Sequence, residues 1–286
     1  MISVAALILT HNEEENIART MAAIPPVEQV VIVDSQSSDQ TLEIAKRARP
    51  DVRVVQREFD AHTEQWNFGL DQVTTEWVLT LDADYELSPE LQAEIAELEP
   101  TPDVVGYAAE FEYRIYGHPL RASSYPPRVV LFRVAKARYV DDGHTQLLKP
   151  NGRVEKLAGK IYHDDRKPLS HWIQAQDRYA ILEARHLLEM RNAESGLRNL
   201  DGPEGGSRKE KINFQDRLRL KIFFAAPAMF VYLLFARGLI LNGWQGWYYV
   251  MQRTIAEMLL SLRLLTEREG LEEAEKEGSK RPTSNA

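Results

Sequence analysis

The stretch WVLTLDAD at residues 77–84 is an apolar run that ends in two carboxylates, Asp82 and Asp84. A continuous apolar run is typical of a strand that is buried on both faces of a sheet. Three earlier runs lie at residues 4–9, 30–33 and 52–55; the first two are continuously apolar, and the third is apolar except for Arg53. Helical patterns separate these runs, and Ser88 followed by Pro89 is typical of a helix start. This alternation predicts right-handed βαβ units and an α/β fold with a mostly parallel sheet.

The pattern changes after residue 103. Residues 104–163 contain longer, partly alternating strands with Gly and Pro between them, which predicts antiparallel additions at the edge of the sheet. Residues 171–190 return to helical spacing. We therefore expect one domain over residues 1–192, followed by a Gly-rich linker at 193–207.

Residues 208–266 combine basic and aromatic side chains. Two runs of fifteen uncharged residues lie here, one between Lys221 and Arg237 and one between Arg237 and Arg253. Each is shorter than the ~20 apolar residues that a spanning helix needs. Nine of the 25 aromatic residues lie between residues 223 and 249. We predict a helical hairpin that associates with a membrane surface through residues 208–265. A buried hairpin that covers the first domain, or an oligomer contact, is the alternative.

Composition narrows the function classes. The chain has no cysteine, which excludes disulfides, zinc–thiolate sites and cysteine nucleophiles. Residues 1–150 carry 25 acidic and 13 basic side chains, a balance that argues against nucleic acid as a partner. Neither a dinucleotide fingerprint nor a P-loop is present. Residues 1–16 have the pattern of a strand rather than of an export signal. Residues 267–286 are charged and have the pattern of a frayed helix and a disordered tail.

Polar residues follow three of the predicted strands. Asp82 and Asp84 follow the fourth strand, Asp34 ends the second, and the first ends in the stretch at residues 10–13, Thr-His-Asn-Glu. Ligands of open α/β sheets bind at the carboxyl ends of the strands, so we expect these groups to line one cleft, suited to a nucleotide. Two carboxylates also suit a hard divalent cation. Solvated loop aspartates, or a helix cap, are the alternative interpretation.

These motifs together resemble a known family. The segments ILTHNEEENI, VIVDSQSSDQT, QWNFGL and WVLTLDADYELSPEL, in this order, resemble inverting glycosyltransferases of family 2, which have the GT-A fold. The later segments RVVLFR, DDGHTQLL and KIYHDDRKPLSHW resemble the branch that contains lipopolysaccharide core β-1,4-glucosyltransferases. The resemblance implies a nucleotide-sugar donor, usually UDP-linked, and Mg²⁺ or Mn²⁺ as cofactor.

The resemblance also implies roles for single residues. Asp82 would approach the ribose and Asp84 would hold the metal, with His163 as a further metal ligand or phosphate contact. Gln65 and Asn67 would lie in a helix beside the donor, although both are equally explained as surface amides. The nucleoside pocket would be lined by Thr10, His11, Asn12, Glu13 and Asp34.

The base that takes the proton of the acceptor hydroxyl is expected after the edge strands. Asp142, and next to it Asp141, are the candidates, and a turn formed by Asp-Asp-Gly is the competing explanation. The sequence departs from the family pattern at Tyr85 and Thr145, where acidic residues are common. If the acidic residue that Thr145 replaces is the usual base, activity depends on Asp142 acting as the base.

The sequence thus predicts a metal-dependent inverting glycosyltransferase at the cytoplasmic side of the plasma membrane. It would add one hexose to a lipid-linked or lipopolysaccharide-type glycan. A catalytically impaired membrane-bound scaffold is one alternative. A sugar-phosphate nucleotidyltransferase is another, but the stretch at residues 11–15, His-Asn-Glu-Glu-Glu, would repel a triphosphate.

Overall fold

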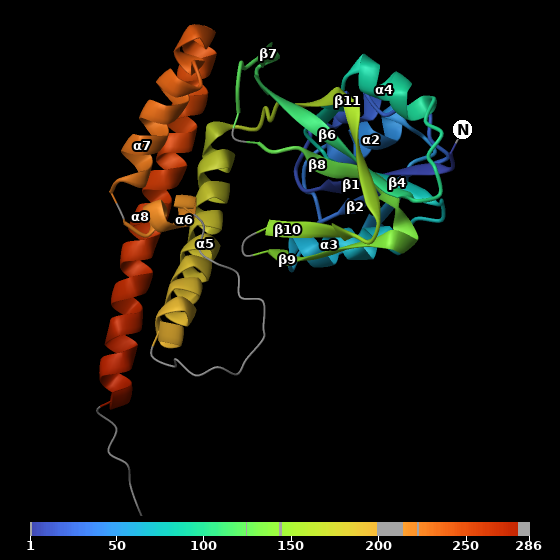
Figure 1. Cartoon of the computed structure of the whole chain (residues 1–286). Helices are drawn as coiled ribbons and strands as arrows, with labels where there is room; N and C mark the ends of the chain where they lie inside the picture. Colours follow the sequence, from blue (N-terminus) through green and yellow to red (C-terminus); the bar gives the residue numbers. More distant parts are fainter. Residues whose placement is uncertain (1, 124, 143–144, 199–213, 222, 280–286) are drawn as a thin grey trace, which may run out of the picture. The chain divides into compact units, whose positions relative to one another are not determined.

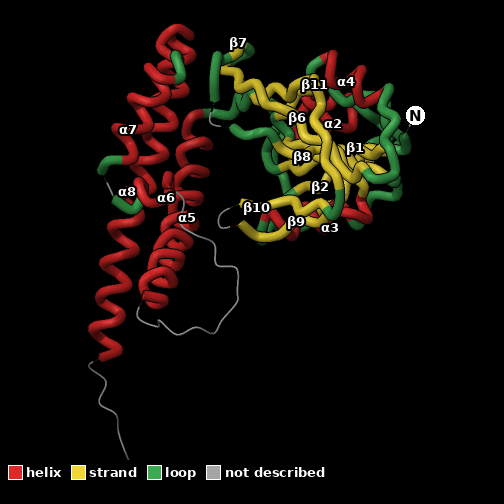
Figure 2. Tube along the Cα trace, viewed as in Figure 1, coloured by secondary structure: helices red, strands yellow, loops and turns green. Residues whose placement is uncertain are grey.

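The computed structural model describes residues 2–123, 125–142, 145–198, 214–221 and 223–279. The chain forms two units, Met1–Pro168 and Leu169–Ala286, which we call the sheet unit and the helical unit (Figure 1). Figure 2 shows strands with covering helices in the first and helices alone in the described part of the second.

The sheet unit contains eleven strands and four α-helices in its described residues. The strands are β1 (Val4–Thr10), β2 (Gln29–Asp34), β3 (Arg53–Gln56), β4 (Trp77–Asp82), β5 (Tyr85–Leu87), β6 (Val104–Ile115), β7 (His118–Pro119), β8 (Arg128–Arg133), β9 (Ala137–Asp142), β10 (Thr145–Pro150) and β11 (Arg153–His163). The helices are α1 (Ile17–Ala22), α2 (Thr41–Ala48), α3 (His62–Leu70) and α4 (Pro89–Ala96), with a 3₁₀ turn at Val134–Lys136.

The main sheet has the order β3-β2-β1-β4-β8-β6-β11-β5. The four predicted strands form its parallel half, β3-β2-β1-β4. Strand β8 then pairs antiparallel with both β4 and β6, so the predicted antiparallel extension is present. Two features were not predicted: β11 runs parallel to β6, and β9 and β10 form a separate hairpin.

Apolar side chains cover both faces of this sheet. On one face, Ile17 of α1, Ala45 of α2 and Leu91 of α4 share a core with β1, β2 and β4. On the other face, Trp66 and Leu70 of α3 pack with residues of β1, β2 and β4 and with the β9–β10 hairpin. Burial on both faces explains why β1, β2 and β4 are almost entirely apolar, whereas the edge strand β3 is partly exposed. Ser88 begins α4 as predicted, because its side chain accepts a hydrogen bond from the amide of Leu91.

Strand register brings the predicted polar groups to one edge. Thr10 pairs with Asp34, and Leu9 pairs with Asp82, so β1, β2 and β4 end together. Strand β5 follows Asp84 directly and pairs antiparallel with the end of β11, with Tyr85 opposite His163. This pairing brings the chain around residue 163 to the same edge as the carboxylates after β4.

The helical unit is built around two long helices, α5 (Leu169–Arg198) and α8 (Gly243–Ser279), which lie side by side (Figure 1). Between them come α6 (Phe214–Arg219), α7 (Ala225–Val231), a π-helical turn (Tyr232–Ala236) and a 3₁₀ turn (Leu239–Asn242). Helix α5 continues six residues into the stretch where the sequence indicated a linker, and the rest of that stretch lies outside the described residues. Gly238 and Gly243, with φ of +69° and +61°, flank the 3₁₀ turn.

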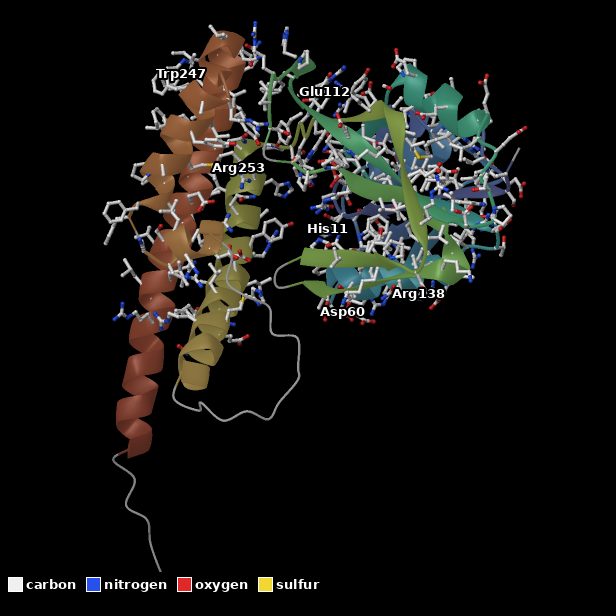
Figure 3. All side chains as sticks on the ribbon, in the orientation of Figure 1. His11, Asp60, Glu112, Arg138, Trp247 and Arg253 are labelled. Atoms are coloured by element: carbon white, nitrogen blue, oxygen red, sulfur yellow. The ribbon has the colours of Figure 1, made fainter. Side chains whose placement is uncertain are left out.

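The helical unit exposes many aromatic side chains. Phe223, Phe224, Tyr232, Phe235, Trp244 and Trp247 are each at least 43% exposed. Figure 3 shows Trp247 projecting from this unit. No single helix in the described residues has the length and apolar character of a membrane span, but Ala225–Ala236 and Leu239–Arg268, bent by 70° to each other, reach it together.

Candidate active site

Asp84 and His163 form the centre of the candidate site. Asp84 lies between β4 and β5, and His163 ends β11, 79 residues later. Asp84 Oδ2 lies 3.0 Å from His163 Nε2. The side chains are 15% and 11% exposed, so both reach the surface while most of each is buried. The structure therefore brings together the two residues that the sequence analysis assigned to the metal.

The charges of this pair support each other. Burial raises the pKa of Asp84, but the charge of His163 and its hydrogen bond outweigh this effect and bring the pKa below its usual value. Burial lowers the pKa of His163, and the charge of Asp84 more than offsets it, so that pKa is raised. The pKa of Asp82 is raised by burial and by the charge of Asp84. A positive charge at this edge would thus be stabilised by two carboxylates.

Asp34 is fully buried and its carboxylate is occupied within the protein. Its Oδ1 accepts hydrogen bonds from Thr10 Oγ1 at 2.9 Å and from Ser37 Oγ at 2.5 Å. Its Oδ2 accepts from the Ser37 amide at 2.9 Å and from Gln56 Nε2 at 3.3 Å. Thr10 and Asp34 therefore hold the ends of β1 and β2 together beneath the site edge.

The loop after β1 presents more open groups. His11 is exposed (Figure 3), and its Nδ1 lies 2.8 Å from the carbonyl oxygen of Ser35. Asn12 has φ of +53°, an unusual conformation that asparagine tolerates better than most residues. Its side-chain Oδ1 accepts a hydrogen bond from the backbone N–H of Ser38, and its backbone N–H donates to Ser37 Oγ. Asn12 thus fixes the loop that follows β2.

Glu13 and Lys167 form a mostly buried ion pair near the same edge. Lys167 Nζ lies 2.5 Å from Glu13 Oε1, and the side chains are 22% and 12% exposed, in that order. Burial raises the pKa of Glu13 to about 7, against the opposing effect of Lys167. Glu13 follows a predicted strand and is therefore visible in the sequence, whereas Lys167 is not, because the two residues are 154 positions apart in the chain.

Asn16, fully buried, connects these two segments. Its Nδ2 donates to Glu13 Oε2 and to Asp165 Oδ1, both at 2.9 Å. Its Oδ1 accepts from the Arg166 amide at 3.0 Å and from the Arg19 side chain at 2.8 Å. One amide therefore ties the loop after β1 to the segment after β11.

Gln65 and Asn67 both lie on α3, as the sequence indicated. Gln65 Nε2 donates to Ser35 Oγ at 2.8 Å, so this side chain supports the loop after β2. Asn67 uses its whole amide on the backbone of Tyr139, donating to its carbonyl at 3.0 Å and accepting from its N–H at 3.1 Å. Asn67 thus attaches strand β9 to α3.

Replacing Asn67 by alanine is expected to loosen the β9–β10 hairpin. The change leaves the N–H and carbonyl of Tyr139 without partners, which should cost about 1–3 kcal/mol in unfolding free energy. Hydrogen exchange measured residue by residue should show faster exchange at Tyr139 than in the wild type. Glu64→Ala, at an exposed position of the same helix, is the control and should leave that rate unchanged. Equal exchange in both variants would contradict this role of Asn67.

The two candidate bases lie at the end of β9. Asp141 is exposed and pairs with Gln146 of β10. Asp142 is the last residue of β9, and its side chain lies outside the described part of the structure. The hairpin that carries both is held on the sheet unit by Asn67.

An aromatic cluster, which the sequence analysis did not predict, surrounds His163. Its members are Tyr85, Phe111, Tyr113 and Tyr125. The ring centroids of Tyr85, Tyr113 and Tyr125 lie 5.3, 4.7 and 5.0 Å from that of His163. Phe111 packs against Tyr85 at 5.0 Å. The only sequence signal was Tyr85 at a position where family members often carry an acid, and the cluster explains why an aromatic residue suits it.

A family model described as glycosyl transferase family 2 matches residues 5–145. The sheet unit belongs to glycosyl transferase family 2. The matched segment ends within the β9–β10 hairpin, so β11, His163 and Lys167 lie beyond it.

Relatives of known sequence agree with this assignment. An uncharacterized glycosyltransferase of Rickettsia typhi is 36% identical over 96 residues, and this match spans about a third of each chain (33% and 32%). The lipopolysaccharide core biosynthesis glycosyltransferase LpsC of Rhizobium meliloti is 25% identical over 275 residues, which cover 92% of both chains. The similarity to LpsC therefore extends past the family 2 segment into the helical unit.

Solved structures support the same fold. A mannosyltransferase of Pyrobaculum calidifontis, solved with GDP-Man and Mn²⁺, superposes with a TM-score of 0.50 at 16% identity, covering 93% of this chain and 86% of that one. This likeness identifies a mixed α/β, GT-A-like fold and confirms that part of the sequence-based prediction.

Proposed function

We propose that the protein is a metal-dependent inverting glycosyltransferase that transfers one hexose from a nucleotide sugar, UDP-linked, to a glycan hydroxyl. The pairing of Asp84 with His163 at the carboxyl edge of a family 2 sheet is the observation that carries this proposal. The similarity to LpsC over 92% of both chains supports a lipid-linked or lipopolysaccharide-type acceptor.

The residues present fit Mg²⁺ or Mn²⁺ as the cofactor. A carboxylate oxygen and an imidazole nitrogen 3.0 Å apart are able to bind the same ion. Asp84 and His163 would be the two protein ligands, because the described residues contain no group of three or more acidic, His or Cys side chains that could hold a metal. Water and substrate phosphates are the other ligands that Mg²⁺ commonly takes. When bound, the ion would offset the negative charge of the departing diphosphate.

The remaining groups have separable tasks in this proposal. His11, Asn12 and Glu13 would contact the nucleoside. The hydrogen bonds of Thr10, Asp34 and Gln65 would hold the underlying loops in place. Asp82 would contact the ribose. Asp142, or Asp141 beside it, would take the proton from the acceptor hydroxyl as that oxygen attacks the sugar from the face opposite the diphosphate.

Donor binding tests the proposal without knowledge of the acceptor. Calorimetry with the full chain in mild detergent would compare UDP and GDP, each with Mn²⁺, with Mg²⁺ or with a chelator. We expect UDP to bind in the presence of either ion, and the chelator to weaken binding by at least about tenfold. Absence of nucleotide binding under every condition would rule out the proposed function.

We also propose that the helical unit attaches the protein to the cytoplasmic face of the plasma membrane. Its exposed aromatic side chains and the bent pair of helices support an element that lies in a bilayer interface. A cavity of about 440 Å³ next to α7 and α8 adds apolar surface, and its lining includes Phe223, Phe230 and Met258. Exposed apolar surface of this extent is unusual in a protein that has no partner.

Replacing Phe224, Phe235 and Trp244 together by serine is expected to release the protein from membranes. These side chains are 66%, 60% and 56% exposed, so their loss removes interfacial contacts without opening a core. We expect the fraction that sediments with anionic liposomes to fall by about tenfold or more. Phe59→Ser with Tyr116→Ser, two exposed aromatics of the sheet unit, is the matched control. Equal sedimentation of both variants would contradict the attachment.

A further inference from the structure

Arg128 has a guanidinium whose donors make no hydrogen bond to any residue that the structure describes. It begins β8, next to Ala109 of β6, and its guanidinium lies 5.0 Å from the ring centroid of Tyr125. Within the described residues it has no hydrogen bond and no ion pair. Arg133, at the other end of the same strand, differs in each respect: it donates to the carbonyl of Val104, pairs with Glu76 and packs on Trp77.

A free guanidinium at this place is costly to the protein. Arg128 is half-buried, and a guanidinium carries five donors that lose water on burial. Burial lowers the pKa of Arg128, but nearby Tyr125, Tyr85 and Asp82 more than offset that effect and keep the group charged. A charged guanidinium that is partly dehydrated, and that has neither a hydrogen bond nor an ion pair in the described part of the chain, is suited to binding an anion from solution.

The aromatic cluster provides a surface for a sugar beside that charge. The ring centroid of Tyr125 lies 5.0 Å from that of His163, and its hydroxyl lies 3.3 Å from that of Tyr85. Tyr113 and Phe111 lie 6.5 and 5.1 Å from Tyr125, and all three rings are half-buried. Tyr125 is partly exposed, and aromatic rings that reach the surface are suited to pack against the apolar face of a pyranose. Tyr125 thus contacts both the free arginine and a member of the proposed metal pair.

We propose that Tyr125 and Arg128 form the acceptor subsite of this domain, and that the subsite takes a sugar bearing an anionic group, a phosphate or a carboxylate. The sugar ring packs on Tyr125, the anionic group binds the guanidinium, and the acceptor hydroxyl is held near the Asp84–His163 pair. The inference rests on the proposed function, because the subsite is defined relative to the donor.

Titrations of the full chain, preloaded with UDP and Mg²⁺, test the subsite. The probes are glucose 6-phosphate, glucuronate, inorganic phosphate and methyl glucoside, followed by calorimetry or by ligand-observed NMR. We expect at least one anionic probe to bind about tenfold more tightly than methyl glucoside. Preference for glucose 6-phosphate or inorganic phosphate assigns the anion as a phosphate, and preference for glucuronate assigns it as a carboxylate.

Three variants make the test specific. Arg128→Gln should abolish the preference for the anion, and Arg128→Lys should retain part of it, since lysine keeps the charge and loses the planar fork. Arg138→Gln removes an exposed arginine paired with Asp71 (Figure 3) and should leave every affinity unchanged. Thermal unfolding of each variant identifies a change that acts through folding.

The results separate this inference from the proposed function. If UDP does not bind to the wild type, the proposed function fails. If UDP binds but no anion is preferred, or if Arg128→Gln keeps the preference, the subsite is wrong while the function stands. A loss of UDP affinity of fivefold or more in Arg128→Gln, with Arg128→Lys restoring it, would assign the guanidinium to the donor diphosphate and would also overturn the inference.

Discussion

Replacing Asp84 by asparagine is expected to abolish sugar transfer. Asparagine has nearly the same shape and still contacts His163 Nε2, so the change removes charge while it preserves packing. Under the proposed function, the site without that carboxylate would lose a ligand of the cation that would offset the charge of the diphosphate. We expect metal-dependent release of nucleotide from the sugar donor to fall by roughly a thousandfold, which corresponds to about 4 kcal/mol in the transition state.

Glu86→Gln is the matched control for this experiment. Glu86 lies two residues later, on β5, is partly exposed and pairs with Arg19. The control removes the same charge close to the site, and it should leave nucleotide release within about twofold of the wild type. If Asp84→Asn retains full activity, with the metal still required, Asp84 does not hold the cation. A similar loss of activity in Glu86→Gln would mean that the total negative charge at this edge of the sheet matters, rather than Asp84 in particular.

Replacing Gly159 by alanine is expected to be the most destabilising small substitution in the sheet unit. A methyl group at this position would lie 2.4 Å from the Cα of Leu91 and 2.5 Å from its nitrogen. Both are backbone atoms of α4, so relief requires the helix and β11 to separate. We expect a loss of about 3 kcal/mol in unfolding free energy, at the upper end for overpacking, and a melting temperature lower by roughly 6–12 °C.

Ala158→Ser is the control for the glycine. Ala158 precedes Gly159, is exposed, and shares with it the same acceptor, the carboxylate of Glu94. The extra hydroxyl should change the unfolding free energy by no more than about 0.5 kcal/mol. Calorimetric scans of both variants and the wild type make the comparison. If the melting temperature of Gly159→Ala lies within about 2 °C of the wild type, α4 moves away from β11 at little cost.

The three central parallel strands are predictable from the sequence because they are buried on both faces. Residues 4–9 and 30–33 are apolar throughout, residues 77–81 are apolar except for Thr80, and each run becomes a central strand. The start of α4 is also local, since one serine side chain and one proline determine it. Strand β11 is different, because its register shifts between Lys156 and Lys160 and the close approach at Gly159 leaves no periodic signal.

The candidate site divides in the same way. Asp82 and Asp84 are visible because they follow a buried strand, and register alone brings them to the edge. Lys167 is not visible, because its importance depends on Glu13, far away in the chain. Arg128 is not visible, because its importance depends on its three-dimensional setting beside Tyr125, without an ion pair in the described residues. Asn67 shows a third case: its position on α3 is as the sequence indicated, but its contact with Tyr139 depends on a hairpin that was not foreseen.

The pairing of β5 with β11 has a consequence for gene fragments and for newly synthesised chains. A polypeptide that contains only residues 5–145 would carry Asp84 without His163, and Glu13 without Lys167. During translation, this edge of the sheet would stay incomplete until the ribosome had released residue 167. Recombinant products trimmed to residues 5–145 should consequently be inert, however well their first four strands assemble.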